Sequence, residues 1–72
     1  MADHLRAQGV TDTELQVARL AAQGWRNKEI AGELYMAVRT VELRLTGVYR
    51  ALGISSRKDL AQALVDTHLM ED

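Results

Sequence analysis

The apolar positions of residues 37 to 52 recur at intervals that suit one face of an α-helix. Val41, Leu45, Val48 and Leu52 are spaced four, three and four residues apart. This spacing places their side chains on one stripe of a helix with about 3.6 residues per turn. The segment is therefore predicted to form one helix whose apolar stripe faces a hydrophobic core.

The opposite side of this predicted helix combines short and basic side chains. It holds Arg39, Leu43, Thr46, Gly47 and Arg50, with Glu42 and Arg44 on its flanks. A glycine inside a helix costs about 1 kcal/mol against alanine. A helix that lies in the DNA major groove would account for this face, because arginines reach phosphates and short side chains meet base edges. From this stretch alone, a solvated face on which Gly47 is incidental remains the alternative.

Two further helices are predicted ahead of this segment. Thr11 and Glu14 have the spacing of a capping box, and the apolar face that follows predicts a core helix that ends at Gly24. Asn27 is expected to cap a short helix over residues 28 to 34, whose apolar side chains point inward. Trp25, between the two helices, is expected at the edge of the core.

Residues 35 to 37 are too few to form anything but a turn between the short helix and the longer one. A short helix, a tight turn and a longer helix make a helix-turn-helix unit. Tyr35 and Met36 are expected to pack against the short helix and to set the crossing angle. Lys28 lies in the first turn of the short helix, where its charge opposes the helix dipole unless an anion such as phosphate binds there. An exposed, solubilising lysine is the alternative.

A fourth helix is predicted from about residue 57 to residue 69. Leu60, Ala61 and Leu64 are expected to form its core stripe, yet further apolar residues fall outside that stripe. A two-fold dimer through this helix would bury them, and a partly exposed terminal helix is the alternative. The candidate dimer contacts are Leu60, Ala63, Leu64 and Thr67.

Composition narrows the class of protein. The 72 residues are enough for one small domain, and no stretch alternates as a strand would, so the expected fold class is all-α, a four-helix bundle. The chain has no cysteine, which excludes disulfides and thiolate metal sites. Its apolar runs are too short to span a membrane, and its polar amino end is unlike a signal peptide. The cytoplasm is the expected location.

Charge and the choice of polar residues favour binding over catalysis. The net charge is −1, but residues 26 to 58 hold seven basic residues against three acidic ones. This central balance of +4 favours a negatively charged partner. His4 has no second histidine or cysteine near it in sequence, and nothing indicates a nucleophile with its base or a phosphate-binding glycine loop. We therefore expect no enzyme activity, no metal, no cofactor and no small-molecule site.

Three stretches of the chain match a known pattern in order and in spacing. They are VTDTELQVARLAAQGWRNKEIAGEL, VRTVELRL and VYRALGISSRKDL, which together run from Val10 to about Leu64. This order resembles the LuxR/FixJ-type, or GerE-like, DNA-binding domain of bacterial transcription regulators. That family typically has Gly-x-x-Asn-Lys-Glu-Ile-Ala before the turn and Thr-Val-Glu in the recognition helix. The resemblance implies a four-helix bundle whose second and third helices form the helix-turn-helix and whose fourth helix commonly dimerises.

The resemblance also implies roles for individual residues. The residues that would enter the major groove are Glu42, Leu43 and Thr46. The residues that would contact the DNA backbone are Lys28, Arg39, Thr40 and Arg44, with Arg50 and Arg57 as further candidates. The chemistry fits these roles, because a carboxylate can accept from a cytosine amino group, leucine can meet a thymine methyl group, and a hydroxyl can donate or accept.

Three positions depart from the family pattern. Ala37 stands where Ser or Thr is usual, so the recognition helix lacks a side-chain N-cap that is typically worth about 1 kcal/mol. Arg44 stands where histidine is usual, and its permanent charge should steepen the salt dependence of DNA binding. Gly47 stands where a longer polar residue is frequent, which removes one possible contact.

We therefore expect a leader at residues 1 to 9, a DNA-binding domain at 10 to 69 and a tail at 70 to 72. The expected function is sequence-specific binding of double-stranded DNA as the output domain of a bacterial transcription regulator, with residues 38 to 52 in the major groove. The expected partners are DNA, a second copy of the chain and, as a further candidate, RNA polymerase. A protein-interaction module that has lost DNA binding is the alternative. The chain is either a stand-alone regulator or the C-terminal piece of a longer protein.

Overall fold

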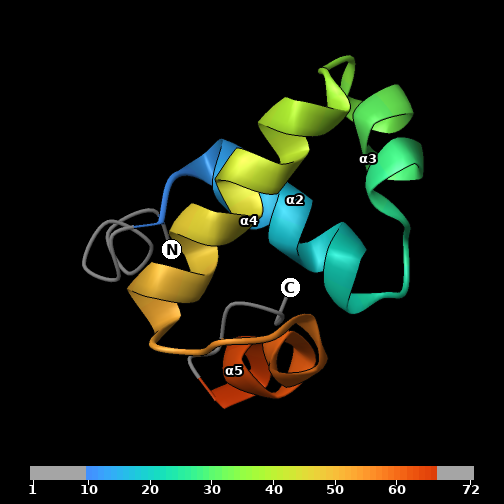
Figure 1. The fold of residues 1–72 in the computed structure, drawn as a ribbon. Coiled ribbons are helices and arrows are strands. Elements are labelled where there is room, and N and C mark those ends of the chain that lie inside the picture. Colours follow the sequence, from blue (N-terminus) through green and yellow to red (C-terminus); the bar gives the residue numbers. More distant parts are fainter. Residues whose placement is uncertain (1–9, 67–72) are drawn as a thin grey trace.

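Residues 10 to 66 fold into four α-helices and one short 3-10 helix (Figure 1). The computed structural model describes residues 10 to 66. The elements are α2 (Asp12–Ala22), α3 (Asn27–Leu34), α4 (Val38–Leu52), η1 (Arg57–Asp59) and α5 (Leu60–Asp66). No strand occurs between residues 10 and 66, and the predicted all-α class is confirmed. The predictions for the leader with His4, for Thr67 and for the tail lie outside the described residues.

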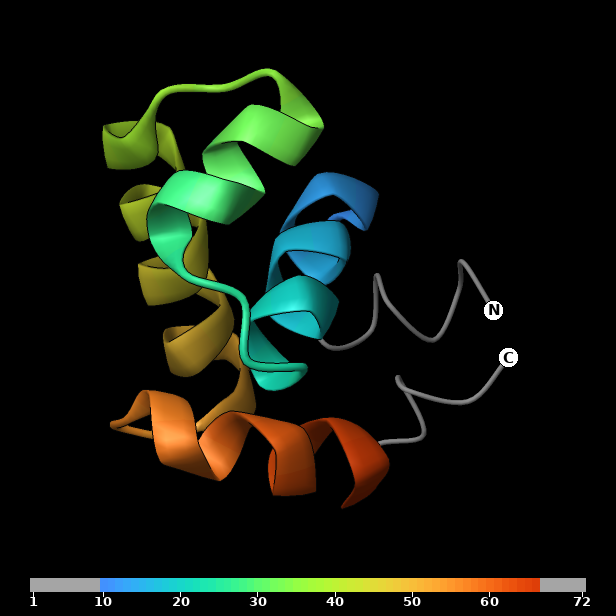
Figure 2. The same cartoon turned by 90° about the vertical axis from the view of Figure 1, so that its right-hand side faces the viewer.

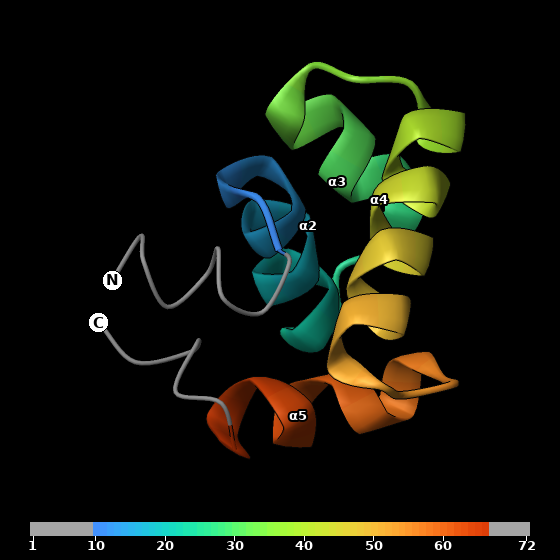
Figure 3. The same ribbon diagram turned by 90° about the vertical axis from the view of Figure 1, so that its left-hand side faces the viewer.

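α2 is the central helix of the described segment and packs against α3, α4 and α5, while α4 packs against both α2 and α3. Figures 2 and 3 show α3 near one end of the molecule and α5 lying across the other. The buried core takes residues from every α-helix: Val10, Leu15, Val17, Ala18, Ala21, Ile30, Ala31, Val41, Leu45, Val48, Leu60 and Leu64. Three members of the predicted stripe of α4 are thus buried, whereas Leu52 is only partly buried at the rim.

The capping box at the start of α2 is confirmed. The Thr11 hydroxyl oxygen accepts from the N–H of Glu14 at 3.1 Å, and Glu14 Oε1 accepts from the N–H of Thr11 at 3.0 Å. These two bonds satisfy N–H groups that have no partner inside the helix. Near the other end of α2, Gly24 adopts a φ of 97°, a conformation that turns the chain and that glycine tolerates best.

The start of α3 differs from the prediction. The N-cap residue is Arg26, and its N–H donates to the Glu29 carboxylate at 2.7 Å. Asn27, predicted to be the cap, is the first residue of the helix. Its Oδ1 accepts instead from Arg57 at 2.6 Å. The prediction was wrong because the helix begins one residue earlier than expected, which places Asn27 inside its first turn.

The two residues expected to pack against α3 differ in their burial. Met36 is partly buried against the core, and its contact with α3 stays a prediction. Tyr35 does not pack against α3, because its side chain is 96% exposed. Its backbone is left-handed, with φ 55° and ψ 47°, and this reversal of the chain turns the side chain toward solvent.

The phase of α5 corrects the predicted dimer contacts. Leu60 and Leu64 are fully buried, which confirms their predicted place in the core stripe and leaves neither available to a second copy. Ala61, predicted to be in the core, is exposed, and Ala63 is half-buried. Val65 on this helix is also exposed, at 55%. The helix follows η1 directly, and the path of that connection sets which side of α5 meets the core.

Candidate nucleic-acid interface

The outer face of α4 is open to solvent along its length. The exposed residues on it are Arg39, Glu42, Leu43, Arg44, Thr46 and Arg50, and Thr40 is half-buried. Leu43 is 54% exposed, so its apolar side chain is open to a partner on this face. Because Val41, Leu45 and Val48 anchor the other side, α4 presents these groups from a rigid support.

Two interactions within α4 involve the candidate base-reading residues. Arg39 Nη1 and Glu42 Oε1 form an ion pair at 3.2 Å. The hydroxyl of Thr46 donates to the main-chain oxygen of Glu42 at 3.0 Å, which leaves the hydroxyl oxygen free to accept. Exposed ion pairs contribute little to stability. The carboxylate of Glu42 and the guanidinium of Arg39 can therefore exchange partners at low cost.

Gly47 lies at the contact between α4 and α2, which corrects its predicted place on the outer face. A Cβ at this position would lie 2.6 Å from Oε2 of Glu14, the carboxylate of the capping box. The missing side chain thus makes room for a carboxylate of the same domain. The spacing within α4 did not reveal this, because the crossing of α2 decides which neighbour approaches.

The start of α4 lacks a side-chain cap, as predicted from the residue type. Ala37 is the N-cap residue, and no side chain accepts from the first N–H groups of the helix. These groups carry the positive end of the helix dipole. They lie beside Arg39 and Thr40, two of the candidate backbone contacts, so this end of α4 is electropositive.

The start of α3 presents Lys28 to solvent in the first helical turn. Arg57 was also predicted near the DNA backbone, but its side chain is engaged within the protein. Its Nη1 donates to Asn27 Oδ1 at 2.6 Å and its Nη2 donates to the main-chain oxygen of Trp25. Arg57 and Trp25 are both half-buried. The structure therefore gives Arg57 an internal role that the sequence did not indicate.

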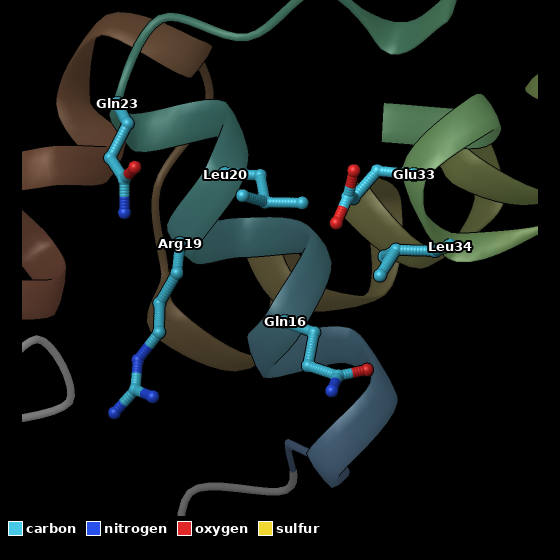
Figure 4. A pocket seen from close by; sticks show the side chains of 6 residues that line it. All are labelled: Gln16, Arg19, Leu20, Gln23, Glu33 and Leu34. Carbon is cyan, nitrogen blue, oxygen red and sulfur yellow. The ribbon is translucent and has the colours of Figure 1, made fainter. Parts of the chain in front are cut away.

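A separate groove lies between α2 and α3 (Figure 4). It is lined by Gln16, Arg19, Leu20, Gln23, Glu33 and Leu34. None of these residues belongs to α4, so the groove is distinct from the exposed face of that helix. Its lining offers one carboxylate and no nucleophile. Between residues 10 and 66, no group of three His, Cys, Asp or Glu side chains is placed to hold a metal ion.

The helices of the described segment are all too short or too polar to cross a membrane.

Known proteins share this arrangement of residues. Residues 8 to 64 match the family described as bacterial regulatory proteins, luxR family. A protein of Mycobacterium bovis and one of Mycobacterium tuberculosis, both named as helix-turn-helix transcriptional regulators, are each 47% identical over 51 residues. The oxygen regulatory protein NreC of Staphylococcus aureus is 38% identical over 58 residues. No solved structure matches the chain.

The matches cover much of this chain and little of the larger relatives. They span 71% of the chain and 6% of each mycobacterial protein, and 81% of the chain and 27% of NreC. The likeness thus concerns the helix-turn-helix domain rather than a whole regulator. Because the family match covers most of the chain, this protein belongs to the luxR family of bacterial regulatory proteins.

Proposed function

We propose that this chain binds double-stranded DNA in a sequence-specific manner, as the output domain of a bacterial transcription regulator. The observation that carries the proposal is the two-sided construction of α4. One side is buried and fixes the helix, while the other exposes short groups between arginines. A helix of this kind suits the major groove, which admits a single α-helix.

The groups in the middle of α4 are proposed to read bases. Glu42 can accept from a cytosine amino group once its carboxylate leaves Arg39, and Thr46 can accept through its free lone pair. Leu43 can meet a thymine methyl group, which would give its exposed side chain an apolar neighbour. These three residues therefore supply specificity.

The surrounding cations are proposed to position the domain on the phosphates. Lys28 at the start of α3 and Arg39 and Arg44 on α4 are exposed, and Thr40, in the first turn of α4, is half-buried. Arg50 would reach the backbone from the far end of α4. Such contacts are independent of sequence and weaken as salt rises.

The form of the protein that binds DNA tightly is proposed to be a homodimer that reads two half-sites. One domain of this size offers one recognition helix, and pairing two of them adds affinity without a new contact type. Ala61 and Val65 are exposed on α5 and supply an apolar surface for this contact. RNA polymerase is a further partner that a bound regulator in the bacterial cytoplasm would meet.

The test is a selection from a random duplex library with the purified chain at two salt concentrations. We expect an enriched inverted repeat that weakens as salt rises. The matched control is a chain with Glu42→Ala, which should enrich a different motif, because it loses an acceptor and keeps the phosphate contacts. No enrichment at low salt by a chain that is helical and folded would refute the proposal and favour a protein-interaction module.

A further inference from the structure

Arg57 joins two parts of the chain that are far apart in sequence. Its guanidinium donates from η1 to the Asn27 side chain, thirty residues away, and to the main-chain oxygen of Trp25, thirty-two residues away. The side chain is half-buried between these acceptors. The two bonds leave from the two terminal nitrogens, so they use the planar fork of the group.

The two acceptors flank the start of α3. Trp25 immediately precedes the N-cap residue Arg26, and Asn27 is the first residue of the helix. The fork therefore holds both the entry of the chain into α3 and its first turn. The next residue is Lys28, which the proposed function places on a DNA phosphate. The direction in which that ammonium projects depends on the turn that Arg57 holds.

We infer that Arg57 is a positioning residue for DNA binding, which acts through the first turn of α3 rather than by contact with DNA. This inference rests on the proposed function, since it needs Lys28 to bind phosphate. It also assigns a role in DNA binding to the hydrogen bonds between η1 and the start of α3. The same link fixes the start of α5, which follows η1 without a break.

The choice of substitution at residue 57 distinguishes a positioning role from a direct contact with phosphate. Lysine keeps the positive charge but cannot span two acceptors with a rigid fork. A direct contact would thus tolerate Arg57→Lys, whereas a positioning role would not. Asn27→Ala removes one acceptor and leaves every charge in place. Lys58→Gln is the matched control, because it removes a neighbouring cation that is exposed.

The experiment measures the dissociation constant of each variant for the duplex enriched in the library selection. The measurements cover a range of salt concentrations, at a temperature well below the melting temperature of each protein variant. We expect Arg57→Lys and Asn27→Ala each to raise the dissociation constant about tenfold, the loss typical of one charged hydrogen bond. Lys58→Gln should change it by less than about twofold. Far-ultraviolet circular dichroism confirms that each variant is folded.

The decisive comparison repeats Arg57→Lys in a Lys28→Ala background. If Arg57 acts through Lys28, the second substitution adds less than about twofold. Full additivity, or binding by Arg57→Lys equal to that of the unaltered chain, would overturn the inference and leave the proposed function standing. Failure of the unaltered chain to bind any duplex would overturn both, while coupling between Arg57→Lys and Asn27→Ala in thermal unfolding would still reveal the bond between them.

Discussion

Replacing Gly47 with alanine tests whether this position serves the fold or the DNA contact. A glycine-to-alanine change inside a helix ordinarily stabilises a protein by about 1 kcal/mol. Here the new Cβ would lie 2.6 Å from Oε2 of Glu14, which is closer than two such atoms can approach. Oε2 is the far end of a flexible side chain and must shift, and we expect that shift to break the bond that Oε1 of the same carboxylate accepts from the Thr11 N–H.

The two effects should nearly cancel. Losing the capping interaction costs about 1 kcal/mol, which is similar to the gain in helix propensity. Gly47→Ala is therefore expected to leave the free energy of unfolding almost unchanged. In a Glu14→Ala background the clash is absent, and the same substitution should stabilise the domain by about 1 kcal/mol relative to that background.

The matched control is Gly32→Ala. Gly32 also lies inside a helix, and nothing stands within 4 Å of a Cβ added there. This change should stabilise the domain by about 0.5 to 1 kcal/mol in either background. Urea denaturation followed by circular dichroism gives the free energy of unfolding for all variants. Equal stabilisation by the Gly47 and Gly32 substitutions in the unaltered chain would show that Glu14 is not restrained, and the reasoning would fail.

Three further predictions concern the DNA face, α5 and the turn. Lys28→Ala should weaken binding about equally on all duplexes, whereas Glu42→Ala should change base preference. Competition assays with single-base variants of the selected duplex measure both effects, and a uniform loss of affinity from both substitutions would argue against base reading by Glu42. Leu64→Asp should unfold the domain by placing a charge in the core, whereas Val65→Asp should leave it folded and monomeric. Thermal melts measure folding and sedimentation measures the oligomeric state, and equal melting and sedimentation of the two variants would contradict the prediction. Tyr35→Gly should raise the free energy of unfolding by about 0.5 to 1 kcal/mol because it relieves a left-handed conformation, while Tyr35→Ala should not; equal urea midpoints for the two would refute the strain argument.

Patterns within single segments predicted most of the fold. The stripe that contains Val41, Leu45 and Val48 is buried, and the capping box from Thr11 to Glu14 forms as its spacing indicated. Both signals connect residues that are three or four apart in one helix. They are determined by helix geometry alone, so they survive whatever the helix packs against.

The wrong predictions have a different cause, because they depend on contacts between separate elements. Asn27 was expected to cap a helix and instead binds Arg57, and Gly47 was placed on the outer face and instead adjoins Glu14. Leu64 was predicted to lie in the core, which is confirmed, but its second assignment to a dimer contact does not hold because it is buried in its own domain. In each case the partner lies on another element, and no local spacing reports it.

The sequence by itself determined the helices, the face of α4 that is buried and the face that is exposed. These follow from the period of the helix and from bonds between near neighbours in the chain. Only the tertiary structure decided that Ala61 faces solvent, what Gly47 makes room for and which acceptors Arg57 joins. Those outcomes depend on where helices cross, and a crossing brings together side chains whose separation along the chain carries no periodic signal.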